Sequence, residues 1–329
     1  MKSDPPFGAR VWMALALGVC GLLAAAPARA ADSWPSRPVK VIVPYPAGGS
    51  TDVLARMVTR RLGNALGQPF IVENRFGANG NIGAAAVATA PPDGYTLLIS
   101  TTGPLSFNKL IYKSAAFDPV KDFTPIIEVA SIPLLVAVNA SVPLKNIAEL
   151  VAYARDNPGK LTYGTSGIGS MGHLTAEKLQ RDLGIRLTHV PYKGSAPALN
   201  DVVAGTVDLS LDLAPMYAGF VQSGALRALA VTSPDRYPLM PDVPTLTEQG
   251  ASGFDATGWV AVAGPAGLAA DVTRKINGAV NEYLDSDEGK SELLKLGMTP
   301  RGGTPEDLAN RMASEIAKWR EVAEKVAPE

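Results

Sequence analysis

The chain has 329 residues, of which 47% are hydrophobic and 19% are charged, and its formal net charge is −1 at pH 7. This length suffices for one large or two medium domains. The small net charge gives no electrostatic basis for binding nucleic acid or an anionic membrane surface, and neither partner is predicted. The sequence has no repeat period and no low-complexity tract, which argues against a solenoid or a disordered arm.

The first thirty residues have the features of a secretory signal peptide. Lys2 and Arg10 precede an apolar run over residues 11–26, which is short for a membrane span, and Ala28-Arg29-Ala30 forms a small-x-small cleavage site. We predict export and cleavage after Ala30, so that residues 1–30 are absent from the mature protein. Their removal takes away a net charge of +2 and leaves about −3.

The only cysteine, Cys20, lies inside this segment. The exported chain would therefore form neither a disulfide nor a thiolate nucleophile. A lipoprotein signal ending at Cys20 is the alternative, but Val19 stands where such signals have a small residue. With His173 and His189 as the only histidines and no cysteine in the mature chain, no transition-metal site is predicted. No cofactor is predicted either.

Beyond Asp32 the sequence alternates strand and helix patterns, which predicts an α/β fold with mostly parallel strands. A strand at residues 39–43 leads into a helix that starts near Ser50. A middle section, residues 143–253, has its own strands and helices, and its insertion between two halves of an outer domain would give two chain crossings. The other expected strands are 70–73, 95–100, 128–138, 161–164, 187–190, 207–211, 226–231 and 255–263. The expected tail helices are 272–284, 288–296 and one that begins at Thr304.

The stretch from Val39 to Leu54 reads as a strand, a glycine-containing loop and a helix start. Unpaired N–H groups at such a start stabilise an anion placed over residues 48–51. An ordinary turn capped by Ser50 or Thr51 is the alternative. Asp52 would repel an anion in the same place, so we assign it to ordering the loop through backbone N–H groups. We also expect that Gly49→Val, by forcing a Cβ atom into the loop, abolishes stabilisation by the ligand while the protein stays folded.

A second stretch, residues 163–174, repeats this pattern in the middle section, with Ser166, Gly169, Ser170 and His173 in its loop and helix start. If the two loops face each other, two helix N-termini converge on one site, which favours anion binding over two plain turns.

Two catalytic or cofactor-binding alternatives are less well supported. No G-x-x-x-x-G-K-[ST] motif occurs, and the glycines of residues 77–83 have the wrong spacing for a dinucleotide loop. A secreted serine hydrolase would use Ser166 or Ser170 with His173, but both serines lack the flanking glycines of G-x-S-x-G. We therefore predict that the protein is not an enzyme.

Ordered motifs along most of the chain resemble those of one receptor family. They are Trp34-Pro35-Ser36-Arg37-Pro38, Val72-Glu73-Asn74-Arg75, the segment 117–126, the loop 164–173, Val190-Pro191-Tyr192-Lys193-Gly194 and Gly205-Thr206-Val207-Asp208. With the signal peptide, they resemble the Bug family, the periplasmic solute-binding receptors of tripartite tricarboxylate transporters.

The resemblance implies a two-lobed type II periplasmic-binding fold that closes on a small carboxylate, such as a di- or tricarboxylate, an amino acid or an aromatic acid. The expected lobes are residues 31–132 with 257–329, and residues 133–256. The implied partners are the membrane components of a tripartite transporter or, alternatively, a sensor protein. The receptor is expected to be a periplasmic monomer.

The resemblance also implies a set of ligand contacts. The first loop would supply Tyr45, Ala47, Gly48, Ser50 and Thr51, and the second loop Ser166, Gly169, Ser170 and His173. Thr101 or Thr102 and Asp212 would surround the distal end of the ligand. Leu213 stands where relatives often have Asn, so ligand identity is where this chain is expected to differ.

Overall fold

In the first sheet, three parallel strands end at the same edge. The computed structural model describes residues 34–113 and 115–326, so the predicted signal peptide lies outside the described residues. Strand β1 (Val39–Val43) pairs in parallel with β2 (Phe70–Asn74) and β3 (Thr96–Thr101). The side chains of β1 are buried except Lys40, as expected for a β-branched strand inside a sheet. The predicted α/β class is confirmed.

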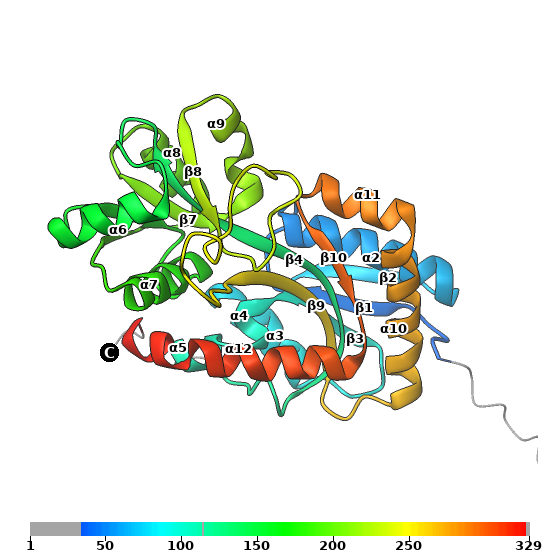
Figure 1. Ribbon diagram of the computed structural model, residues 1–329. Helices are drawn as coiled ribbons and strands as arrows, with labels where there is room; N and C mark the ends of the chain where they lie inside the picture. The colour runs from blue at the N-terminus through cyan, green and yellow to red at the C-terminus, as the bar shows by residue number, and fades with distance from the viewer. Residues whose placement is uncertain (1–33, 114, 327–329) are drawn as a thin grey trace, which may run out of the picture. The chain divides into compact units, whose positions relative to one another are not determined.

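The long strand β4 (Phe123–Asn139) runs through both sheets of the protein, as Figure 1 shows. Its first part, up to Pro133, pairs with β9 (Thr257–Pro265), and its second part, from Leu134, pairs with β7 (Leu209–Leu213). The short β10 (Thr299–Gly302) and β8 (Leu226–Val231) also pair with β4.

The prediction of mostly parallel strands is wrong around β4 and β9. Both of these strands run antiparallel to every neighbour they have in the described chain. The chain leaves the first sheet through β4 and returns to it through β9. The two strands therefore lie side by side in opposite directions.

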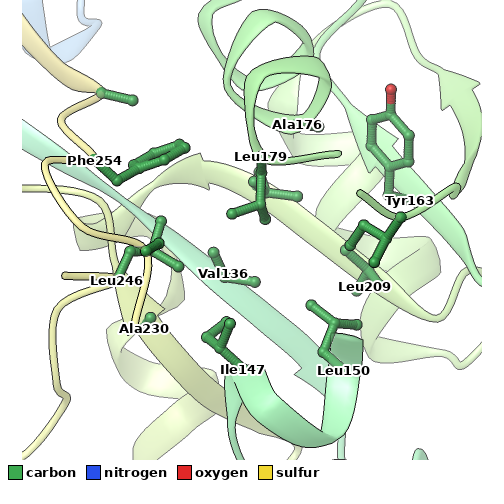
Figure 2. Packing of buried hydrophobic residues seen from close by; sticks show 14 of the residues in the cluster. Val136, Ile147, Leu150, Tyr163, Ala176, Leu179, Leu209, Ala230, Leu246 and Phe254 are labelled. Atoms are coloured by element: carbon green, nitrogen blue, oxygen red, sulfur yellow. The ribbon is translucent and has the colours of Figure 1, made fainter. Parts of the chain in front are cut away.

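The second sheet has its own core. Strand β5 (Thr162–Thr165) pairs in parallel with β6 (Thr188–Pro191) and β7. Figure 2 shows part of the core beside this sheet, where side chains from helices and strands meet, among them Val136, Ile147, Leu150, Tyr163, Leu179, Leu209 and Phe254. This core fixes the starting points of the helices that follow the strands.

The helices form where apolar residues recur at helical spacing. Helix α2 (Ser50–Leu66) buries Leu54, Val58 and Leu62 on one face and ends where Gly67 adopts a left-handed conformation with φ 72°. The other long helices are α3 (Asn81–Ala88), α6 (Ile147–Asp156), α7 (Met171–Leu183), α8 (Ser195–Val203), α10 (Ala270–Asp285), α11 (Asp287–Lys295) and α12 (Pro305–Val326). The short ones are η1 (Ala78–Gly80), α4 (Thr102–Leu105), α5 (Asn108–Ile111), η2 (Ala214–Tyr217) and α9 (Ala218–Gln222).

Helix α12 packs on both cores (Figure 1). Leu308 and Met312 lie in the core of the first sheet, whereas Trp319 and Val322 lie in the core of the second. Between them Glu315 is fully buried, where it accepts hydrogen bonds from the Trp319 indole at 2.6 Å and the Lys318 ammonium at 2.7 Å. The apolar side chains of α12 thus contact both cores, and the buried carboxylate is satisfied by donors of the same helix.

Within the described residues, no helix has both the length and the apolar character that crossing a membrane requires. A group of three or more His, Cys, Asp and Glu side chains suited to a metal ion is likewise absent from the described part of the chain.

Candidate functional site

The loop after β1 is held against the end of β3. The Tyr45 hydroxyl lies 2.5 Å from Oγ1 of Thr101, the last residue of β3. Because β1 and β3 are parallel neighbours, their carboxyl ends lie side by side. Burial raises the pKa of Tyr45, so the phenol stays protonated and available for hydrogen bonding.

Asp52 anchors the same loop from the first turn of α2. One carboxylate oxygen accepts the backbone N–H of Gly48 and the Arg56 Nε–H, each at 2.9 Å, and the other accepts the Asn74 amide at 2.9 Å. Burial alone would raise the pKa of Asp52, but these donors outweigh it and lower the pKa to about 2. Asn74 also donates to the carbonyl of Tyr45, which ties the end of β2 to the loop.

The other predicted contacts of the first loop differ in accessibility. Ala47, Gly48 and Ser50 are exposed, whereas Thr51 is buried. Gly48 has φ 85°, a conformation that favours glycine. The steric reason given for Gly49 is wrong, because its φ is −72° and an added Cβ would meet only the Pro46 carbonyl oxygen, at 3.5 Å. The effect of Gly49→Val on ligand binding stays a prediction.

The second loop is ordered by the start of α7. The Ser170 hydroxyl accepts the backbone N–H of His173 and so caps the helix. The imidazole Nδ1 of His173 in turn accepts the backbone N–H of Gly169 at 3.1 Å. This geometry requires a neutral imidazole that carries its proton on Nε2. Ser166 is half-buried in the same loop.

The two histidines form a stacked pair beneath this loop. The ring of His189 lies 3.9 Å from that of His173, and its Nε2 is 2.7 Å from the Thr165 hydroxyl. The pKa of each histidine is lowered to about 4, chiefly by burial; for His189 the proximity of His173 contributes to this lowering and Glu177 opposes it.

This histidine pair makes stability depend on pH. Between about pH 6.5, where an unfolded histidine titrates, and about pH 4, the unfolded chain binds protons that the folded chain does not. We therefore expect the free energy of unfolding to fall as the pH is lowered from 6.5 to 5, by up to about 1.4 kcal/mol per pH unit for each histidine. Urea unfolding across this range measures the slope. A His189→Gln variant should lose part of it, and an equal slope in variant and wild type would contradict the assignment.

Asp212 and the threonines after β3 lie in different surroundings. Asp212 is buried at the end of β7, where it accepts the Ser195 hydroxyl at 2.6 Å and the Leu213 N–H at 2.8 Å. Burial raises its pKa. The Thr102 hydroxyl accepts the backbone N–H of Trp259 at 2.9 Å, which links the start of α4 to β9.

A tyrosine that sequence patterns do not single out connects the second loop to the loop of residues 77–80. The Tyr112 hydroxyl donates to the carbonyl oxygen of Ile168 and accepts the Asn79 amide, each at 3.2 Å. Asn79 is adjacent to Gly80, whose added Cβ would lie 3.2 Å from the Tyr45 hydroxyl. Tyr112 thus links the second loop to a loop that lies beside Tyr45. Ser195 was missed as well, although Gly194 before it, with φ 128°, marks another helix start.

The geometry does not assemble a serine hydrolase. The Ser170 hydroxyl caps α7, while His173 Nδ1 is engaged by Gly169 and His189 by Thr165. In the described residues, neither imidazole is hydrogen-bonded to a serine hydroxyl. These serines therefore lack the adjacent base that nucleophilic catalysis needs.

Two sheets joined by a shared strand, with a glycine-containing loop and a helix start on each, define the class of two-lobed solute-binding proteins. Residues 54–327 match the family described as "Tripartite tricarboxylate transporter family receptor". Protein BugT of Bordetella pertussis is 38% identical over 290 residues, which cover 88% of this chain and 89% of BugT.

Two solved structures agree in fold. One is Rpa4515 of R. palustris with adipate, with a TM-score of 0.78 and 41% identity, covering 90% of this chain and all of that one. The other is MatC of Rhodopseudomonas palustris with bound malate, with a TM-score of 0.74 and 33% identity, covering 88% of this chain and all of that one.

The chain belongs to the family of tripartite tricarboxylate transporter receptors, which includes the Bug proteins. The family consists of periplasmic solute-binding receptors, so the predictions of a receptor and of a protein that is not an enzyme are confirmed at this level.

Proposed function

We propose that this receptor binds a small carboxylate, with a dicarboxylate as the preferred class, between the loops that follow β1 and β5. The observation that carries the proposal is that each sheet has a glycine-containing loop leading to a helix start, at α2 and α7, and that Tyr112 joins the second loop to Asn79 in the loop after β2. Backbone N–H groups at helix starts stabilise a carboxylate without a cationic side chain. The adipate and malate bound by two relatives support the dicarboxylate class.

The proposed contacts keep the sequence-based set. The carboxylate would meet the first loop at Tyr45, Ala47, Gly48, Ser50 and Thr51, and the second at Ser166, Gly169, Ser170 and His173. Thr101 or Thr102, with Asp212, is proposed for the distal end; the Thr102 hydroxyl also accepts the backbone N–H of Trp259. Asp52 is proposed to order the first loop rather than to touch the ligand.

We also propose the remaining sequence-based assignments. The lobes would comprise residues 31–132 with 257–329 and residues 133–256, which the change of strand partners in β4 at Pro133 supports. The mature protein would be a periplasmic monomer after cleavage of the signal peptide. It would deliver its solute to the membrane components of a tripartite transporter, with a sensor protein as the alternative partner.

A thermal-shift panel tests the ligand class. At 5 mM, adipate, malate, citrate, glutamate and benzoate are compared on the mature chain. A ligand at 100 times its Kd adds about 2.7 kcal/mol of stability, so at least one acid should raise the Tm by several degrees. Dimethyl adipate is the matched control, because it keeps the carbon chain and lacks both charges. Absence of a shift with every acid, or an equal shift with the ester, would contradict the proposal.

A further inference from the structure

Tyr112 lies where the two cores of the protein meet. It follows α5, whose Ile111 is buried in the core of the second sheet, and its own ring packs against both cores. Its position is therefore fixed by packing on both sides, and its hydroxyl can hold a defined place relative to the two loops.

On one side this hydroxyl meets a strained loop. Four consecutive residues, 77–80, have positive φ angles, and two of them are not glycine: Ala78 with φ 46° and Asn79 with φ 53°. Such conformations cost energy and persist where neighbours enforce them. The Asn108 amide donates to the Asn79 carbonyl at 3.0 Å, and the Asn79 amide donates to Tyr112. The segment from Asn108 to Tyr112 thus holds this loop at both its backbone and its side chain.

On the other side it meets the tip of the second loop. The Ile168 side chain is 51% exposed, so the tip gains little from apolar packing, whereas its carbonyl accepts the Tyr112 hydroxyl. Gly169 has φ 73°, and an added Cβ would lie 2.8 Å from the Tyr112 hydroxyl and 2.9 Å from an Ile111 methyl. Only glycine allows the tip to approach this closely.

We propose that Tyr112 is a positioning residue that fixes the tip of the second loop against the loop of residues 77–80, and that it strengthens solute binding through the Ile168 carbonyl without itself holding the solute. The adjacent Gly169 N–H is directed at His173, so a displacement of the tip also disturbs the helix start that we assign to the carboxylate. The effect on affinity rests on the proposed function, whereas the effect on the loop does not.

Tyr112→Phe removes the hydroxyl and keeps the ring that packs on both cores. In the ligand-free mature protein we expect faster amide hydrogen exchange in residues 166–174 and an unchanged Tm. Asn79→Gly, which tolerates the positive φ and removes the amide donor, should act in the same direction more weakly. Tyr283→Phe is the matched control, because it loses a tyrosine hydrogen bond to Glu292 between α10 and α11. Unchanged exchange in Tyr112→Phe would overturn the proposal.

The second measurement uses adipate and malate as probes. Loss of one neutral hydrogen bond should raise the Kd of whichever probe the wild type binds by about 3- to 10-fold, mainly through faster dissociation. An unchanged Kd in Tyr112→Phe would overturn the role in affinity. If the wild type binds neither probe, the dicarboxylate proposal fails, and hydrogen exchange still decides whether Tyr112 holds the loop.

Discussion

Replacement of Gly172 by alanine is expected to destabilise the protein by about 3 kcal/mol and to abolish carboxylate-dependent stabilisation. Gly172 lies in the first turn of α7, and an added Cβ would be 2.1 Å from the carbonyl oxygen of Leu211 in β7. That oxygen belongs to the backbone of a buried strand, so the helix start must withdraw. The cap at Ser170 and the hydrogen bond from Gly169 to His173 then lose their geometry.

Urea unfolding and the Tm shift with adipate measure the two effects. Gly278→Ala is the matched control, because this exposed glycine lies inside α10 and an added Cβ would have no neighbour within 4 Å. It should be neutral or stabilising by up to about 1 kcal/mol, since alanine is the better helix former. A Gly172→Ala protein as stable as Gly278→Ala would refute the close approach of α7 to β7.

Asp52→Asn should have the second large effect. The amide keeps the shape of the carboxylate but places an NH2 group opposite a donor, either Asn74 or the pair of Gly48 and Arg56. We expect a loss of about 2 to 3 kcal/mol of stability at pH 7 and weaker solute binding, because the first loop loses its anchor.

The pH dependence of the stability loss in Asp52→Asn shows whether the charge of Asp52 causes it. The pKa of Asp52 is lowered to about 2, so its contribution is complete above its ordinary pKa near 3.8 and is lost as the pH falls through about 2. The difference in unfolding free energy between wild type and Asp52→Asn should therefore be constant from pH 7 to 5 and shrink from pH 4 to 2. Asp271→Asn, an exposed acid in the first turn of α10, should have little effect. A difference that persists undiminished at pH 2 would argue against the charged hydrogen bonds.

Local elements of the fold were predictable because their signals are local. Residues 39–43 form β1 as predicted, and α2 and α12 begin within a residue of the predicted starts at Ser50 and Thr304. The directions around β4 were not predictable, since β-branched runs look alike in parallel and antiparallel sheets. The short β10 was missed because Pro300 and Gly302 break the strand pattern.

The candidate site likewise has features that the sequence indicates and features that it does not. The two loops are visible in the sequence as strand, glycine and helix start, and the structure places Tyr45 against Thr101 and His173 against Gly169. Tyr112 and Ile168 are 56 residues apart, and no pattern near either residue indicates their contact. The left-handed conformation of Ala78 and Asn79 is likewise set by tertiary contacts, because neither residue type requires it.

The contacts of the C-terminal helix α12 indicate whether a fragment of this receptor would be stable on its own. A fragment that ends before Trp319 would leave the core of the second sheet without that indole and without Val322 and Ala323, although the sheet itself is intact. Conversely, residues 133–256 alone would lack both α12 and Phe107 from that core. Either fragment would therefore be unstable on its own. We expect both cores to unfold in a single cooperative transition that depends on Trp319, Val322 and Ala323 of α12.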